Sequence, residues 1–334
     1  MVSPMILVKK DPNKAAPQGP KPILPAWIMH SNKSESLGSK TLEEAGFASG
    51  AALALLHVVL TDPNIATPPK LLRQRLALKA AVQCLKIEGR SDDEAQLRDA
   101  YYLTKPGDMM GPGGDMLALW HNATRIAFRG TTSGLGWGEK LASLLLEHMR
   151  DVLPNWLDVF IDDQSSHLNP VSKSAEMIAR VLKDFPREET IALMLADVVL
   201  ARALGWQQVM PLMALYMKRK PLREFDDRQQ LNLACHQAVT KSALEAIRHS
   251  HDLARRAARL KNVAPKLRAK GSDKAVELFL SEDAVSPSSM LAPMIKGTNI
   301  SMTDRSARRL CDRLVVLGVI RELTGRSTFR LYGV

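Results

Sequence analysis

Residues 302–317 read MTDRSARRLCDRLVVL and show two contrasting faces at helical spacing. Apolar residues recur every three or four positions on one face, whereas arginines and aspartates occupy the other. Ser301, with Asp304 three residues later, predicts where this helix begins, and Gly318 predicts where it ends. The stretch therefore predicts an amphipathic helix with a buried apolar side and a basic side.

The sequence on both sides of this helix predicts a small module. Residues 319–323 and 328–332 alternate apolar and polar side chains around a polar turn, which predicts a β-hairpin. Residues 273–280 and 288–295 predict two short helices upstream. A winged helix-turn-helix has this order of elements: two helices, a polar-faced third helix and a hairpin. We therefore assign residues 264–334 to a winged helix-turn-helix module.

The remainder of the chain predicts helices. Aromatic residues make up only 5% of the 334 residues, while alanine and leucine recur throughout, which favours helices over sheets. Residues 1–38, rich in proline, predict a flexible N-terminal arm. Residues 39–263 predict an irregular multi-helix bundle, so the expected fold class is mainly α. Its predicted helices lie at about 41–60, 70–87, 91–103, 116–129, 137–152, 155–163, 173–184, 188–204, 207–218 and 222–263, the last bent or broken once.

The positive charge is concentrated near the C-terminus. From Arg255 to the end, the chain has 16 Lys and Arg against 7 Asp and Glu, a local charge of +9 out of a total of +11. Such an excess favours an anionic partner, with nucleic acid first and an anionic membrane surface second. A solvated basic surface is the simpler alternative.

Double-stranded DNA is the partner that the predicted module favours. In a helix-turn-helix, the N-terminal half of the recognition helix enters the major groove, where arginine binds guanine through two hydrogen bonds. The residues placed for such contacts are Thr303, Arg305, Ser306, Arg308 and Arg309. Wing contacts are expected from Arg326 and Arg330, and contacts to phosphates from Arg255, Arg256, Arg259, Lys266, Arg268 and Lys270. The alternative is a protein-docking module whose arginines are only solvated.

One segment of the predicted bundle, residues 104–115, is rich in glycine and proline. Loops of this composition sometimes bind a ligand, because backbone amides can approach a phosphate closely. Its candidate ligand residues are Lys105, Gly107, Asp108, Gly111, Gly113 and Gly114. The spacing matches neither the phosphate loop nor the dinucleotide fingerprint. An ordinary connection between helices is favoured, and an enzyme or small-molecule sensor with its site here is the rival function.

The sequence shows no recognisable catalytic motif. It lacks His-Glu-x-x-His, Cys-x-x-Cys and Gly-x-Ser-x-Gly, so neither a metal nor a cofactor is expected. Cys84, Cys235 and Cys311 are far apart and lie in apolar helical patterns, which predicts buried thiols in a reducing cytoplasm. No uninterrupted apolar stretch approaches the roughly 20 residues that span a bilayer. A soluble, cytoplasmic protein without a membrane partner is expected, and the oligomeric state cannot be predicted.

Several segments also resemble an uncharacterised bacterial family catalogued as domain of unknown function 1403. The resemblance spans roughly residues 40–334 and rests on residues 71–81, 93–100, 103–108, 263–271 and 321–333. The family occurs mostly in rhizobia, agrobacteria and their relatives, often on plasmids. The resemblance therefore implies a bacterial, accessory-genome setting and no particular activity. It also implies that the loop at 104–108 and the terminal hairpin are family features.

Overall fold

The structure is a computed structural model that describes residues 41–105, 107–128, 136–162, 168–267, 269–326 and 328–334. The predicted N-terminal arm, residues 1–38, lies outside the described residues, as does Arg268.

The described chain is mainly helical, which confirms the predicted fold class. Its α-helices are α2 (Leu42–Thr61), α3 (Pro69–Ile87), α4 (Glu94–Tyr102), α5 (Gly111–Arg125), α6 (Trp137–Ala142), α7 (Glu147–Arg150), α8 (Leu153–Leu157), α9 (Pro170–Asp184), α10 (Glu189–Ala203), α11 (Met213–Tyr216), α12 (Arg219–Arg223), α13 (Arg228–Val263), α14 (Ser272–Phe279) and α15 (Asp304–Val316). Shorter elements are the turns η1 (Asp158–Asp162), η2 (Ala264–Lys266) and η3 (Pro287–Leu291), and the strands β1 (Arg321–Glu322) and β2 (Tyr332–Gly333).

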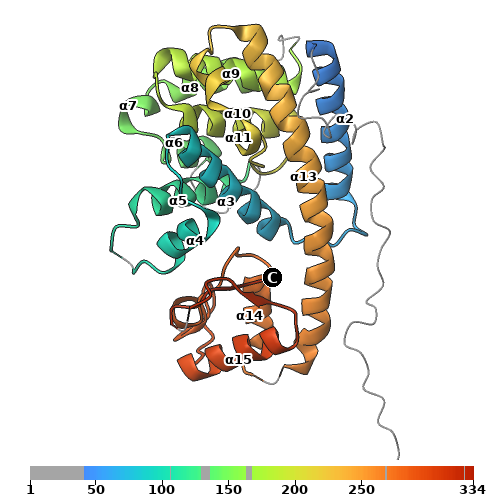
Figure 1. The fold of residues 1–334 in the computed structure, drawn as a ribbon, viewed down its shortest axis with the longest axis vertical. Coiled ribbons are helices and arrows are strands. Elements are labelled where there is room, and N and C mark those ends of the chain that lie inside the picture. Colours follow the sequence, from blue (N-terminus) through green and yellow to red (C-terminus); the bar gives the residue numbers. More distant parts are fainter. Residues whose placement is uncertain (1–40, 106, 129–135, 163–167, 268, 327) are drawn as a thin grey trace, which may run out of the picture.

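Helix α13 connects the two parts of the molecule (Figure 1). Its 36 residues extend for about 54 Å at the usual helical rise. Helices α2, α9 and α11 pack against it, and its end leads into residues 264–334, which we call the C-terminal segment. Where α2 meets α13, a hydrogen bond of 2.6 Å joins Ser49 Oγ and His236 Nδ1. Burial lowers the pKa of His236 to about 4, so this imidazole is neutral at pH 7 and has a structural partner.

The core of the helical body includes a buried carboxyl group on α10. Asp197 is fully buried, and its Oδ1 accepts hydrogen bonds from the amides of Leu212 (2.9 Å) and Met213 (2.8 Å) at the start of α11. Its Oδ2 has no hydrogen-bond partner among the described residues. Burial raises the pKa of Asp197 to about 8, although the backbone amides of Leu212, Met213 and Ala214 act in the opposite direction. The carboxyl group is therefore protonated over much of the neutral range.

The substitution Asp197→Asn should change how stability depends on pH. Because the folded-state pKa is raised, the proton on Asp197 stabilises the fold fully below about pH 4, and this contribution is lost as the pH rises towards 8. Asparagine keeps the oxygen that accepts both amides and does not titrate. The free energy of unfolding of the variant, relative to wild type, should increase between pH 5 and pH 8 in urea titrations.

The exposed Asp226→Asn variant serves as the control. Its free energy of unfolding should differ from that of wild type by a constant amount between pH 5 and pH 8. Parallel stability curves for Asp197→Asn and wild type would show that the carboxyl group does not titrate as its burial predicts.

Several predicted helices are shorter in the structure than in the sequence pattern. The predicted helix at 137–152 is divided into α6 and α7, and the hydroxyl of Ser143 donates to the carbonyl of Lys140 (2.7 Å) where α6 ends. The predicted helix at 207–218 contains only α11 as helix. The break expected within 222–263 falls between α12 and α13, after which α13 runs without interruption.

The C-terminal segment contains less regular structure than a winged helix-turn-helix predicts. The predicted helix at 288–295 is the single turn η3, and residues 292–303 then fold back on themselves through hydrogen bonds from Ile295 N to Ile300 O and from Met302 N to Pro293 O, both 2.9 Å. The predicted five-residue strands are the two-residue β1 and β2, which pair antiparallel. The C-terminal segment is therefore helical with a two-stranded sheet, and the predicted winged helix-turn-helix is not confirmed.

Glycine is required where the C-terminal segment begins. Gly271 precedes α14 with a φ of 81°, a left-handed conformation that favours glycine. A Cβ atom at this position would lie 2.8 Å from side-chain atoms of both Ile295 and Ile300. The connection from α13 into α14 therefore depends on glycine for its backbone conformation and for the close packing of residues 292–303.

Helix α2 is long and apolar enough to cross a membrane by length and composition alone. The core helices of soluble proteins pass the same test. In the structure, α2 packs along α13 and buries Ala52, Leu56 and Val59 among other residues. Membrane association was not expected from the sequence, and that expectation stays a prediction.

Candidate nucleic-acid interface

Helix α15 separates its apolar and basic residues onto different sides. Its buried residues are Ala307, Leu310, Cys311 and Leu314, and the helix packs against η3 and β1. The N-cap of the helix is Thr303 and not the predicted Ser301: Thr303 Oγ1 accepts a hydrogen bond from the amide of Ser306 (3.3 Å). Gly318, with a φ of 66°, follows the helix and ends it as the sequence predicted.

The five residues predicted to meet bases or phosphates in the major groove are all exposed. Thr303 and Ser306 are partly committed to the helix cap, where the hydroxyl of Thr303 also donates to Ser306 Oγ (2.9 Å). Arg308 forms an ion pair of 2.7 Å with Asp304, one turn earlier. Arg305 and Arg309 are exposed and form no ion pair with any described residue. These two guanidinium groups are the most available donors on the N-terminal half of α15.

The basic residues at the end of α13 are less available for phosphate contacts than the sequence suggests. Arg255 and Arg256 both bind the carboxylate of Asp252, at 2.5 and 2.7 Å. Arg259, Lys266 and Lys270 are exposed. The predicted phosphate contact at Arg268 lies outside the described residues.

The terminal hairpin is held against the helical body. The guanidinium of Arg326, one of the two predicted wing residues, forms an ion pair with Asp99 on α4. The other, Arg330, is exposed and donates from Nε to the carbonyl of Arg326 (2.8 Å). A wing contact to nucleic acid through Arg326 would compete with its ion pair to Asp99.

Residues 104–115, the candidate ligand loop, are only partly a loop. Lys105, Gly107 and Asp108 are exposed in a turn, but α5 already begins at Gly111, so the loop prediction is wrong for residues 111–115. Pro112 is compatible with this start, since the first helical turn needs no amide donor.

The two glycines that follow belong to the packing between α4 and α5. Gly113 and Gly114 are buried, and a Cβ atom on Gly114 would lie 3.3 Å from the backbone of Ala100 on α4. Gly114 thus allows the close approach of α4 and α5, whereas a Cβ atom on Gly113 would make only ordinary contacts, the nearest 3.5 Å from Leu97.

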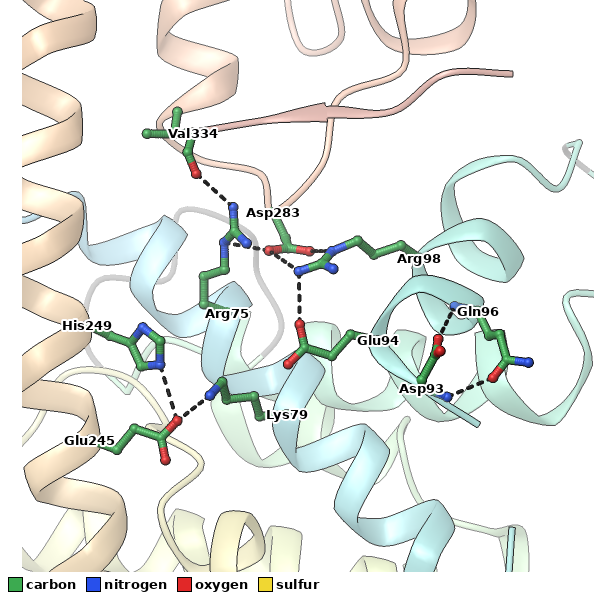
Figure 2. A network of polar contacts seen from close by, with 10 residues as sticks. All are labelled: Arg75, Lys79, Asp93, Glu94, Gln96, Arg98, Glu245, His249, Asp283 and Val334. Carbon is green, nitrogen blue, oxygen red and sulfur yellow. Dashed lines mark hydrogen bonds and ion pairs between the residues drawn. The ribbon is translucent and has the colours of Figure 1, made fainter. Parts of the chain in front are cut away.

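The C-terminal segment is anchored to the body by a buried carboxylate that sequence reasoning missed. Asp283 is fully buried between two arginines, Arg75 on α3 and Arg98 on α4, as Figure 2 shows. Arg75 Nε lies 2.6 Å from Asp283 Oδ1, and Arg98 Nε lies 2.5 Å from Oδ2. Burial alone would raise the pKa of Asp283, but the two guanidinium groups outweigh it and hold the pKa below its usual value.

The same arginines bind the last residues of the chain and the body itself. Arg75 Nη2 donates to the carbonyl of Val334 (3.1 Å), and Arg98 Nη2 pairs with Glu94 Oε2 (3.3 Å) (Figure 2). Gly333 leaves room for this arrangement, since a Cβ atom there would lie 2.9 Å from the Asp283 carbonyl oxygen. Three separate stretches of the chain thus converge on one carboxylate.

A second, partly buried carboxylate fixes α13 within the body. Glu245 on α13 binds Lys79 on α3, and its Oε1 lies 3.2 Å from His249 Nε2 (Figure 2). The hydroxyl of Tyr216 on α11 also donates to Glu245. Burial raises the pKa of Glu245, but its three partners outweigh this effect and hold the pKa far below the usual value. Ion pairs with α3 therefore position both the middle of α13, through Glu245, and the C-terminal segment, through Asp283.

The three cysteines are buried and free, as the sequence predicted. Burial raises the pKa of Cys84 and Cys311 to about 12. Among the described residues, no three His, Cys, Asp or Glu side chains lie close enough together to hold a metal ion.

The fold and surface thus define a mainly helical protein with a basic C-terminal segment anchored by a buried ion-pair network. The chain matches the family model described as "Protein of unknown function (DUF1403)" over residues 13–334 and belongs to that family. Among curated proteins, none is significantly similar to it in sequence. The resemblance deduced from the sequence is confirmed, and the family assigns no activity.

Replacing Asp283 with alanine should destabilise the protein by about 3–5 kcal/mol, because two buried guanidinium groups would lose their counter-charge. Urea unfolding at pH 7 measures this loss. The exposed Asp108→Asn variant is the control and should change the free energy of unfolding by less than about 0.5 kcal/mol. A loss below about 1 kcal/mol for Asp283→Ala would mean that the network does not hold the segment.

Proposed function

We propose that the C-terminal segment binds double-stranded DNA and that α15 is the helix that enters the major groove. The observation that carries this proposal is the pair Arg305 and Arg309, which are exposed on α15 and make no ion pair with any described residue. Their side chains come from the N-terminal half of the helix, the part that contacts bases in helix-turn-helix proteins. Figure 1 places α15 on the side of the segment away from the body, where a duplex has access.

The order of elements supports the same function. Helix α14, the extended residue Val285, turn η3, helix α15 and strands β1 and β2 follow one another as the elements of a winged helix do. Val285 pairs with Tyr332, and β1 pairs with β2, so three stretches share one small antiparallel arrangement. The departures are the single-turn η3 and the 12 residues from 292 to 303 that separate η3 from α15, where a helix-turn-helix has a short turn.

The distribution of charge adds a sequence-independent attraction to phosphates. Of the seven acidic residues from Arg255 onwards, Glu282 and Asp283 are buried against arginines and a lysine, so they do not offset the exposed basic residues. Arg259 is exposed near the end of α13, and Lys266 and Lys270 are exposed between α13 and α14. Contacts of these residues with phosphates would strengthen binding and make it salt-dependent.

Within this function, we propose that the protein acts in the bacterial cytoplasm as a regulator or as a maintenance factor of a plasmid or mobile element. The accessory-genome setting that the family resemblance implies supports this use.

The double variant Arg305→Gln/Arg309→Gln should bind duplex DNA at least about tenfold more weakly than wild type, since each good arginine contact contributes about 1–3 kcal/mol. Fluorescence anisotropy with random-sequence and upstream-region duplexes over a range of salt measures the affinity. The dependence of affinity on salt should also become less steep in the variant, because fewer counterions are released.

The matched control is Arg219→Gln/Arg223→Gln, which removes two exposed arginines from α12 on the body and should bind as wild type does. Equal affinity of the α15 variant and wild type at every salt concentration would refute the assignment of α15.

Protein docking is the second candidate function, and a specific observation favours it. Val316 is 78% exposed and Phe329 is 70% exposed, while Val315 and Leu317 beside Val316 are each 37% exposed. Exposed apolar residues of this kind are typical of protein contacts. Absence of DNA binding by the full-length protein at low salt would favour this function over the first.

A further inference from the structure

A cavity of about 340 Å³ lies between α3, α5 and the C-terminal segment, and its charge is unbalanced. Its lining includes four cationic side chains, those of Lys70, Arg73, Arg125 and Lys296, and a single carboxylate, that of Glu282. The net charge of these five residues at pH 7 is therefore +3. Glu282 is already shared, because Arg125 Nη2 and Lys296 Nζ lie 3.4 and 3.2 Å from its oxygens.

Arg73 is the residue that most requires a partner. The residue is only 9% exposed, its Nε has no hydrogen-bond partner among the described residues, and it forms no ion pair with any of them. Burial lowers the pKa of Arg73 to about 10, and no neighbouring carboxylate opposes this shift. Burying a cation without a counter-charge is unfavourable, so proteins usually pair it or bring it to a bound anion.

Neutral polar groups complete the lining beside Arg73. Gln74 is 4% exposed, and its Oε1 has no partner among the described residues. Its Nε2 lies 3.5 Å from the hydroxyl of the buried Thr124, a weak interaction. The two ends of an amide are exchangeable by rotation, so Gln74 can turn its NH₂ group towards an anion. The hydroxyl of Thr124 already donates to the carbonyl of His121 (3.0 Å), so Gln74 is the neutral donor beside Arg73.

We propose that this cavity binds a phosphate group, carried by inorganic phosphate or by a small phosphate monoester. Arginine presents a planar pair of donors that matches phosphate oxygens, and the surrounding lysines favour a doubly charged group over a single carboxylate. The volume lies at the lower end of the range for small-molecule sites, which leaves room for a small organic group on the phosphate.

A bound phosphate would contact both parts of the molecule. Lys70, Arg73 and Gln74 belong to α3 and Arg125 to α5, whereas Glu282 and Lys296 belong to the C-terminal segment. Glu282 also directly precedes Asp283, the residue that anchors the segment. The ligand therefore stabilises the contact between segment and body, and its binding should raise the melting temperature of the whole protein.

Isothermal titration calorimetry and thermal unfolding of the full-length protein test this site with inorganic phosphate and ribose 5-phosphate. Ribose at the same concentration is the uncharged probe, and sodium chloride matches the ionic strength. Both phosphates should bind wild type and raise its melting temperature by a few degrees, and ribose should do neither. Arg73→Met should weaken phosphate binding at least about tenfold and abolish the rise.

Two further variants keep the test decisive. Arg223→Met removes an exposed arginine on α12 and should bind phosphate as wild type does. Lys296→Met changes a side chain that is 47% exposed, so this variant should fold, and it should weaken phosphate binding several-fold. Failure of wild type to bind either phosphate, or equal binding by wild type and both cavity variants, would overturn the proposal.

The same variants separate a small ligand from a phosphate of the DNA backbone. In phosphate-free buffer, Arg73→Met should bind duplex DNA as tightly as wild type, because α15 lies on the far side of the C-terminal segment from α3 (Figure 1). Weaker DNA binding by this variant would assign the cavity to a DNA phosphate and overturn the small-ligand proposal.

Discussion

The position of the C-terminal segment depends on the buried carboxylate of Asp283. Taking a carboxylate out of water is costly, and two guanidinium groups at 2.5–2.6 Å offset that cost. The arginines come from different helices, so the carboxylate fixes both a distance and an orientation. Arg75 also binds the carbonyl of Val334, which ties the end of the chain to the same point. The direction in which α15 faces is therefore set by contacts on the opposite side of the segment.

Apolar packing alone would hold the segment less specifically. Leu331, Tyr332 and Val334 are buried in a core that is continuous with the body. Apolar contacts are not directional, whereas a carboxylate between two guanidinium groups has a narrow range of productive geometries. We infer that the ion pairs contribute mainly to the register of the segment on the body, as polar groups buried in other folds specify one arrangement.

Those parts of the fold that depend on residues close together in the sequence could be predicted from it. The helix predicted at 302–317 is α15, because a strong apolar period over four turns and a glycine at its end are local signals. The structure of residues 104–115 was harder to predict, since Gly111 and Pro112 are typical of loops and are also compatible with the first turn of a helix. The strands were predicted too long because alternation at 319–323 does not reveal where a partner strand ends.

The ion-pair network of Asp283 with Arg75 and Arg98 could not be predicted, because these residues are distant in sequence. Asp283 is 185 residues from Arg98, and nothing local distinguishes it from a surface aspartate. Its setting in the largely apolar stretch FLSEDAV was the one available signal, and it does not name a partner. The exposure of Arg305 and Arg309 was predictable from helical spacing, whereas the ion pair between Arg326 and Asp99 required the tertiary structure.

The central claim, that α15 faces and binds a duplex, is tested most directly by amide hydrogen exchange of the full-length protein with and without saturating duplex DNA. DNA binding through α15 predicts slower exchange at residues 303–316, with no change in α9 and α10 of the body. Unchanged exchange in α15 under saturating DNA, or protection confined to the body, would contradict it.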